Sequence, residues 1–290
     1  MNKSKLCLGT VQFGMCYGVN NALGRKPGKD ECFDIINEAL LAGITCFDTA
    51  HAYGNAESLL GEFPWGDRKP QIISKLPPRC TNTDVKDKLV ESFNSLRMKK
   101  IYGYMLHCAE DMYRKSIMES MELLKEQKLV DKIGVSVYEP EDAMKAVSDK
   151  RIDIIQIPYN VLDQRLDKVG FFEMVQNGHK EIYARSAFLQ GLLLMDPNKA
   201  ESKVNGSGKW IKNFHSIVKD RGYTPSEAAM LYCMYHPGID YVVFGVDTPQ
   251  QLKCNVAIQK EISDFDGCYE DLSGAFLDVP REILMPSLWG

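Results

Sequence analysis

The sequence lacks the features that mark several large classes of protein. It has no long hydrophobic run at its start, since the first apolar stretch ends at Gly9 and is too short for a signal-peptide core or a membrane span. It also has no excess of positive charge, because 39 acidic residues outweigh 35 basic ones and leave a net charge of −4. Neither a nucleic-acid-binding protein nor a membrane protein is therefore expected.

Cysteine is present, but not in patterns that build structural sites. The count of nine is odd, and no two cysteines form a C-x-x-C pair. This usage argues against a secreted disulfide framework and a paired-thiolate zinc site, so we expect no metal and a reduced, cytoplasmic protein. Residues 9–14 read GTVQFG, which does not match the G-x-G-x-x-G turn of Rossmann domains.

Short apolar runs alternate with amphipathic stretches along the chain. We predict eight strands, at residues 5–9, 44–48, 71–75, 101–106, 132–136, 151–157, 181–184 and 241–244. The predicted helices cover residues 30–42, 56–63, 83–96, 113–127, 140–147, 164–177, 206–220, 224–235 and 248–259. Residues 195–207 are predicted to form a surface loop in the seventh unit.

This alternation decides the predicted fold class. A length of 290 residues gives a prior near two domains, but no Pro- or Gly-rich linker divides the chain. Strand–helix alternation predicts a parallel sheet covered by helices, and eight units of about 36 residues favour a closed (β/α)8 TIM barrel over a doubly wound sheet. We therefore expect residues 1–290 to form a single α/β barrel domain.

Four residues that carry chemistry stand near the ends of neighbouring predicted strands. Asp48 ends the second strand, Lys75 ends the third and His107 follows the fourth, while Tyr53 lies in the loop after Asp48. Catalytic groups of barrels gather where strands end, so these side chains are expected to meet at one site. Each residue alone also has a structural explanation, such as a loop anchor or a satisfied histidine, but their joint placement favours catalysis.

The four residues predict a definite reaction. A phenol is a poor proton donor at neutral pH, and a nearby lysine ammonium is expected to lower its pKa. Asp48 would fix Lys75, Tyr53 would protonate a carbonyl oxygen, and His107 would donate a hydrogen bond to that oxygen. No side chain supplies hydride, so a nicotinamide cofactor is implied.

Other candidates near this loop are fewer. His51 lies inside the same loop and is a candidate substrate-binding residue. His179, His215 and His236 fall on or beside amphipathic segments and are weaker candidates. Cys108 adjoins His107, but no paired base is evident for a nucleophilic role.

These residues carry a family likeness. Residues 47–57, FDTAHAYGNAE, resemble the signature F-D-T-A-x-x-Y-G-x-x-E of the aldo-keto reductases. Weaker matches follow in the same order at residues 8–10, 73–75, 106–107, 133–136, 156–160, 191–193 and 245–255. The resemblance implies a (β/α)8 barrel of cytosolic oxidoreductases that usually use NADPH. It implies Tyr53 as the general acid/base, tuned by Asp48 and Lys75, with His107 orienting the carbonyl.

The resemblance also implies a cofactor site along the barrel mouth. Ser136 and Gln156 would hold the nicotinamide carboxamide, with Gly9 and Thr10 at the end of the first strand. The residues implied nearer the pyrophosphate or nicotinamide are Ser186, Phe188, Gln190 and Gly191. Those implied at the adenosine are Gly245, Gln251 and Asn255.

Three positions depart from the family pattern. Val137 stands where Asn usually follows Ser136, and Arg185 stands where many members stack an aromatic side chain on nicotinamide. Residues 245–251 lack the basic residue that commonly binds the 2′-phosphate of NADP(H). Asp247 near that position would repel phosphate or accept a bond from a 2′-hydroxyl. The resemblance thus implies NADP(H), while this departure makes NAD(H) the alternative.

Three functions remain open. The leading one is an NAD(P)H-dependent oxidoreductase that reduces an aldehyde, ketone or sugar-like small molecule to an alcohol. The alternatives are a regulatory protein that binds nicotinamide without turnover, and a redox-neutral epimerase or isomerase that retains its cofactor. The complete set of Asp48, Tyr53, Lys75 and His107 argues against a sensor, while the substrate and the oligomeric state stay open.

Overall fold

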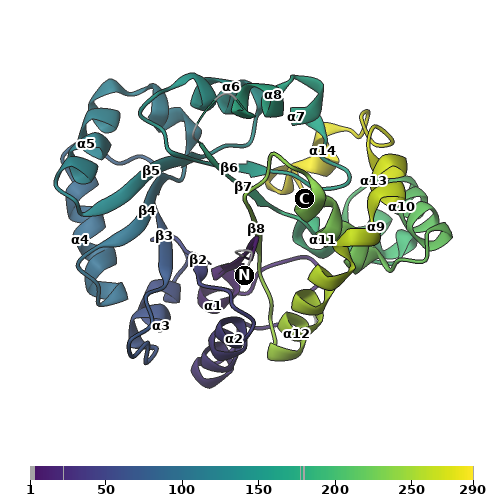
Figure 1. The fold of residues 1–290 in the computed structure, drawn as a ribbon, viewed down its shortest axis with the longest axis horizontal. Helices are drawn as coiled ribbons and strands as arrows, with labels where there is room; N and C mark the ends of the chain where they lie inside the picture. The colour runs from purple at the N-terminus through teal and green to yellow at the C-terminus, as the bar shows by residue number, and fades with distance from the viewer. Residues whose placement is uncertain (1–3, 22, 177, 179, 290) are drawn as a thin grey trace.

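Eight parallel strands close into a barrel in a computed structural model that describes residues 4–21, 23–176, 178 and 180–289. Each strand pairs with the next in sequence, and the last pairs with the first (Figure 1). The strands are β1 (Leu6–Gly9), β2 (Cys46–Asp48), β3 (Gln71–Leu76), β4 (Ile101–Leu106), β5 (Val130–Ser136), β6 (Ile154–Pro158), β7 (Glu181–Arg185) and β8 (Tyr241–Phe244). The closed parallel barrel confirms the predicted fold class.

Helices surround this barrel (Figure 1). Along the chain they are α1 (Val11–Gly14), α2 (Lys29–Leu41), α3 (Ala56–Glu62), α4 (Asp84–Leu96), α5 (Lys115–Glu126), α6 (Pro140–Ser148), α7 (Arg165–Lys168), α8 (Phe171–Gln176), α9 (Pro197–Lys203), α10 (Gly208–Asp220), α11 (Pro225–Tyr235), α12 (Pro249–Ile258), α13 (Asp266–Leu272) and α14 (Arg281–Leu284). Single 3-10 turns cover Ala109–Tyr113, Leu189–Leu194, Gln259–Asp264 and Pro286–Leu288.

Two predicted segments differ from the structure. Residues 195–207 are not a loop throughout, because α9 forms within them. Asp196 caps this helix by accepting hydrogen bonds from the amides of Asn198 and Lys199, and Pro197 occupies the first helical position. The helix predicted over residues 164–177 is two shorter helices, α7 and α8, and its predicted last residue, Asn177, lies outside the described residues.

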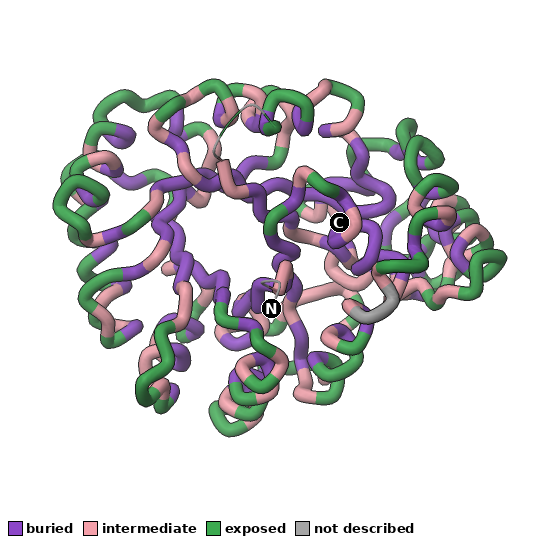
Figure 2. Tube along the Cα trace, in the orientation of Figure 1, coloured by how far each residue is buried: buried purple, intermediate pink, exposed green. Residues whose placement is uncertain are grey.

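The strands are buried on both faces, as expected for a parallel sheet covered by helices (Figure 2). One apolar cluster lies between the strands and the helices. A second fills the barrel interior and is formed by Cys7, Cys46, Ile73, Met105, Ile154, Tyr183, Tyr241 and Val243. Because this interior is packed with side chains, room for a ligand is found at the carboxyl ends of the strands.

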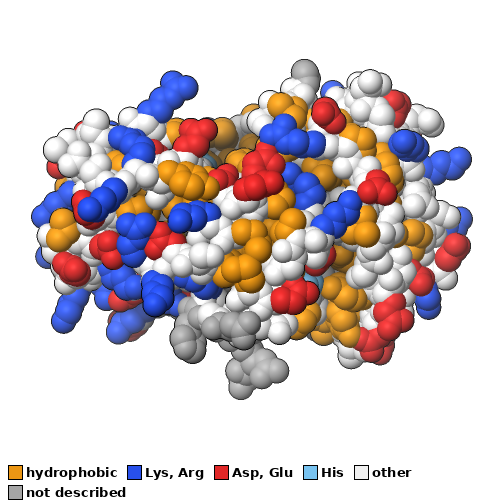
Figure 3. All heavy atoms as spheres, turned by 90° about the horizontal axis from the view of Figure 1, so that it is seen from above, with side chains coloured by type: hydrophobic (Ala, Val, Ile, Leu, Met, Phe, Trp, Pro, Cys, Tyr) orange, Lys and Arg blue, Asp and Glu red, His pale blue; other side chains and the backbone are white. Residues whose placement is uncertain are grey.

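The surface carries both signs of charge. Lys and Arg side chains lie among Asp and Glu side chains over the face seen in Figure 3. Within the described ranges, no helix has the length and apolar character needed to cross a bilayer. The same residues contain no group of three His, Cys, Asp or Glu side chains placed to hold a metal ion. All nine cysteines are free, including Cys7 and Cys46, which are register partners on adjacent strands.

Candidate active site

A buried ion pair lies at the bottom of the site. Asp48 is the last residue of β2 and Lys75 lies in β3, so the neighbouring strands place the two side chains together. The Lys75 Nζ atom lies 2.8 Å from Asp48 Oδ1 and 2.7 Å from Oδ2, and it also donates to the Thr49 carbonyl at 2.9 Å. Burial is the largest single influence on Lys75 and lowers its pKa, but Asp48 together with Tyr53 and Cys7 outweighs it, so the pKa of Lys75 is raised. The ammonium is therefore a fixed cation.

Tyr53 lies above this pair, in the loop between β2 and α3. The Lys75 Nζ atom is 5.1 Å from the centre of the Tyr53 ring. Burial raises the pKa of Tyr53, and the nearby charge of Lys75 only partly counters it. The net direction is opposite to the lowered pKa expected from the lysine alone, because the phenolate would lose its hydration here. Tyr53 is thus a protonated phenol at neutral pH.

His107 completes the set directly after β4. Its ring meets the Tyr53 ring edge-on, with 5.6 Å between the ring centres. Burial, with smaller contributions from Lys75 and Arg185, lowers the pKa of His107 to about 3. Its Nδ1 atom is buried and has no hydrogen-bond partner among the residues that the structure describes. His107 is therefore a neutral imidazole that faces the same space as the Tyr53 phenol.

A cavity of about 410 Å³ opens from these residues along the carboxyl ends of the strands. This volume lies within the range of small-molecule sites. The cavity is lined by Asp48, Tyr53 and His107 together with all the predicted cofactor residues: Gly9, Thr10, Ser136, Gln156, Arg185, Ser186, Phe188, Gln190, Gly191, Gly245, Asp247, Gln251 and Asn255. The structure thus brings residues from β1 to α12 into one continuous site.

Gln156 has a second contact that the sequence did not reveal. Its Nε2 atom donates to Asp48 Oδ1 at 2.8 Å. The Asp48 carboxylate therefore accepts hydrogen bonds from Lys75 and Gln156 at once, which satisfies it in a site where it is almost fully buried. Gln156 connects the buried Asp48–Lys75 pair to the part of the cavity where the carboxamide contact is predicted.

The far part of the cavity is built by β8 and the start of α12. The Thr248 side chain caps α12 by accepting a hydrogen bond from the backbone amide of Gln251 at 3.2 Å. Asp247 is buried, and its Oδ1 atom accepts a hydrogen bond from Asn21 Nδ2 at 3.3 Å. Lys253, the nearby cation in the sequence, pairs with Glu38 at 3.1 Å and does not line the cavity. Among the described lining residues, the far part therefore has one acid and no cation.

The His51 side chain is not among those that line the cavity. Its Nε2 atom lies 3.4 Å from Glu91 Oε2 on α4, and its backbone amide donates to the Lys75 carbonyl at 3.4 Å. His236 is also elsewhere, packed on Phe172 with 3.8 Å between ring centres, and His215 contacts the Leu193 carbonyl at 2.8 Å. His179 lies outside the described residues.

Several lining residues were missed from the sequence. Tyr138 follows Ser136 and Val137 at the end of β5, so the strand-end rule used for the catalytic residues could have found it. Tyr17 comes from a loop after α1 that no motif marks. The Val19 amide donates to the Gln190 carbonyl at 3.1 Å, which joins this loop to the segment after β7. Burial raises the pKa of Tyr17 to about 12.

Known proteins share this fold and sequence pattern. The sequence profile described as "Aldo/keto reductase family" matches residues 5–270. An uncharacterised oxidoreductase of Mycobacterium bovis is 25% identical over 280 residues, covering 88% of this chain and 84% of that protein. Aldo-keto reductase AKR11C1 from Bacillus halodurans has a TM-score of 0.78 at 20% identity, covering 98% of this chain and 96% of the other. A structure titled as a putative aldo-keto reductase of Pseudomonas aeruginosa has a TM-score of 0.69 at 22% identity, covering 90% and 91%.

Proposed function

Because the chain belongs to the aldo/keto reductase family, we propose that it reduces the carbonyl group of a small molecule to an alcohol, with a reduced nicotinamide cofactor as co-substrate. The observation that carries this proposal is the position of Tyr53 and His107. They face one cavity directly above the buried Asp48–Lys75 pair, and that cavity runs on to Asn255. A proton donor and a binding site for a long ligand thus lie in one continuous space.

The residues around the cavity fit a dinucleotide. Gln12 lines the cavity, and its Oε1 atom is buried with no hydrogen-bond partner in the described part of the chain. A Cβ atom at Gly245 would come within 2.1 Å of this oxygen, so the flexible Gln12 side chain lies directly against the Gly245 backbone. Ser136 and Gln156 would hold the carboxamide, and Gly245, Gln251 and Asn255 would contact the adenosine. A bound nicotinamide supplies the hydride that no side chain can provide.

The protein's own residues account for the proton. Tyr53 holds it on its phenol oxygen and donates it to the carbonyl oxygen of the substrate. The phenolate that remains is stabilised by the Lys75 ammonium, which Asp48 keeps in place. The neutral His107 ring orients the carbonyl oxygen by a hydrogen bond, because its low pKa keeps it uncharged throughout.

The far part of the cavity supports NAD(H) over NADP(H). Asp247 lines it, and Lys253 is engaged with Glu38 outside it. A 2′-phosphate next to the Asp247 carboxylate would be repelled, whereas a 2′-hydroxyl could donate a hydrogen bond to it. We therefore propose NAD(H) as the preferred cofactor.

We also infer that residues 1–290 act as a single barrel domain in a reducing compartment such as the cytoplasm. Two features support this inference. The eight strands form one closed barrel, and Cys7 and Cys46 lie side by side as free thiols.

The proposal is tested by incubating the purified protein with NADH and a panel of aldehydes, ketones and sugars while absorbance at 340 nm is followed. We expect NADH consumption with at least one carbonyl compound, and the alcohol as product by mass spectrometry. Tightly bound nicotinamide without net consumption, together with an isomerised substrate, would favour the redox-neutral alternative. Nicotinamide binding with no change in any substrate would contradict the proposed reduction.

A further inference from the structure

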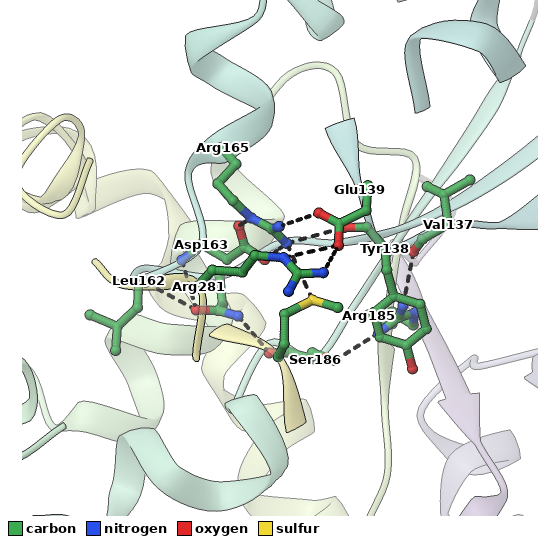
Figure 4. A network of polar contacts seen from close by, with 11 residues as sticks. Val137, Tyr138, Glu139, Leu162, Asp163, Arg165, Arg185, Ser186 and Arg281 are labelled. Carbon is green, nitrogen blue, oxygen red and sulfur yellow. Dashed lines mark hydrogen bonds and ion pairs between the residues drawn. The ribbon is translucent and has the colours of Figure 1, made fainter. Parts of the chain in front are cut away.

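Arg185 is a cation in the cavity whose hydrogen-bond partners are neutral. It ends β7, and its guanidinium lies 4.0 Å from the centre of the Tyr138 ring (Figure 4). Nη2 donates to the Val137 carbonyl at 2.9 Å, and Nη1 donates to Ser186 Oγ at 3.3 Å. A guanidinium has five N–H donors, so these bonds hold the group in place and leave donors for a further partner.

The neighbouring arginines are paired with carboxylates. Arg165 lies 2.7 Å from Asp163 and 3.1 Å from Glu139, and Arg281 pairs with the other oxygen of Glu139 (Figure 4). Asp163 accepts from Arg165 through both of its oxygens. Two carboxylates and two guanidiniums therefore satisfy one another, and Arg185 makes no ion pair within the part of the chain that the structure describes.

Among the described residues that line this part of the cavity, no unpaired carboxylate balances the charge of Arg185, and the nearby Asp163 is already paired with Arg165. Lys75 and Asp48 neutralise each other beneath Tyr53. Tyr17 lines the same cavity, and its raised pKa of about 12 keeps it an uncharged phenol at neutral pH. The acid that lines the cavity at the far end, Asp247, is held by Asn21. The catalytic part of the cavity thus has a net positive charge.

An uncompensated cation in a partly buried site favours a ligand that carries the opposite charge. A planar guanidinium with unused donors matches the geometry of a carboxylate or phosphate, which it binds by paired, charge-assisted hydrogen bonds. An aromatic ring at this position would offer no such contact. Arg185 lines the same cavity as Tyr53 and His107, so an anion bound to Arg185 lies in the space that the Tyr53 phenol faces.

We infer that the carbonyl substrate carries an oxyanion group, a carboxylate or phosphate, which Arg185 binds. This inference rests on the proposed reduction for the identity of the reacting carbonyl, but not for the anion contact itself. Arg185 is then a specificity-determining residue, because it selects anionic carbonyl compounds over neutral ones of the same shape.

Binding can be measured without turnover. The probes are 4-formylbenzoate, 4-formylphenyl phosphate and the neutral methyl 4-formylbenzoate, each titrated into the protein by isothermal titration calorimetry. We expect at least one anion to bind about tenfold or more tightly than the ester, since a charge-assisted contact contributes more than a neutral one. The better of the two anions identifies the oxyanion. The preference should shrink as salt is added.

Variants locate the contact. Arg185→Gln should abolish the preference for the anion, and Arg185→Lys should retain part of it because the charge remains without the planar fork. Arg281→Gln removes the same charge from a half-exposed arginine that is paired with Glu139, and it should keep the preference. Equal binding of anions and ester by the wild-type protein, or a preference that survives in Arg185→Gln, would overturn the inference. An anion preference in a protein that reduces no carbonyl would count against the proposed function instead.

Discussion

The two ends of the cavity are built from different kinds of interaction. The reaction end (Asp48, Tyr53, His107 and Arg185) has buried or partly buried groups whose charges depend on one another and on Lys75. The end where we propose that the nucleotide binds, called the nucleotide end (Gly245, Asp247, Gln251 and Asn255), is built on the start of α12, with capping and amide hydrogen bonds and one buried acid. Both ends line one space, but only the reaction end brings a phenol and an imidazole next to a buried ion pair.

This difference indicates how changes at each end should act. At the reaction end, removal of one charge leaves its partner buried and unpaired, so stability and rate fall together. At the nucleotide end, most contacts are neutral and local, so a change should alter affinity or cofactor choice while the barrel stays stable. The predictions below test that separation.

The largest effect is expected for Lys75→Met. The substitution leaves the Asp48 carboxylate buried with Gln156 as its remaining side-chain donor. The free energy of unfolding should therefore fall by about 3–5 kcal/mol. The rate should fall by about 100-fold or more, because the phenolate of Tyr53 loses its stabilising cation. Urea unfolding and the 340 nm assay measure the two effects.

The control for this variant is the double substitution Asp48→Asn with Lys75→Met. It removes both charges, so much of the stability should return while the activity stays low. If Lys75→Met alone is as stable as the wild-type protein, the buried Asp48–Lys75 pair does not stabilise the site as we expect.

A smaller effect is expected at the nucleotide end. The kcat/KM ratio should favour NADH over NADPH by about tenfold or more, because Asp247 lines the part of the cavity where we propose that the adenosine binds, and no described cation lines that part. Asp247→Asn should reduce the preference for NADH over NADPH without changing the free energy of unfolding appreciably. Lys253→Gln, which alters a cation outside the cavity, should leave this cofactor preference unchanged. A large NADPH preference in the wild-type protein would contradict this account of the nucleotide end.

The smallest change is expected in the pH profile of reduction. The proposed reduction uses the protonated phenol of Tyr53, which is lost only above its raised pKa, and the neutral His107, which is lost only below about pH 3. Between about pH 5 and 9, kcat/KM should therefore vary by no more than about twofold. Oxidation of the alcohol requires the phenolate and should become faster as pH rises. An inflection between pH 6 and 7 in reduction would indicate that His107 titrates and is not held neutral.

The fold could be predicted because the apolar strands and amphipathic helices alternate without interruption. The strand and helix periods are local properties of the sequence, and a closed barrel follows from their number. The helix α9 was missed because the polar residues 195–207 have the composition of a loop. The helix begins here because Asp196 caps it and Pro197 occupies its first position, a signal that depends on only two adjacent residues.

The reaction end could be predicted in outline but not in its electrostatics. The strand-end rule identifies Asp48, Lys75 and His107, and the structure brings them to one place. The direction of the Tyr53 pKa could not be predicted, because it depends on how much burial outweighs Lys75, which only the packed structure reveals. His51 was expected near the substrate because of its neighbours in sequence, but its side chain turns to Glu91.

The most direct test of the separation between the two ends uses Tyr53→Phe, which removes the phenol oxygen and keeps the ring. The dissociation constant for NADH, measured by calorimetry, and the turnover of a carbonyl substrate should be determined on the same preparation. We expect kcat to fall by about 100-fold or more while the dissociation constant changes by no more than about twofold. Turnover close to that of the wild-type protein would contradict the role of Tyr53 as proton donor, and a loss of NADH affinity as large as the loss of rate would contradict the separation of the two ends.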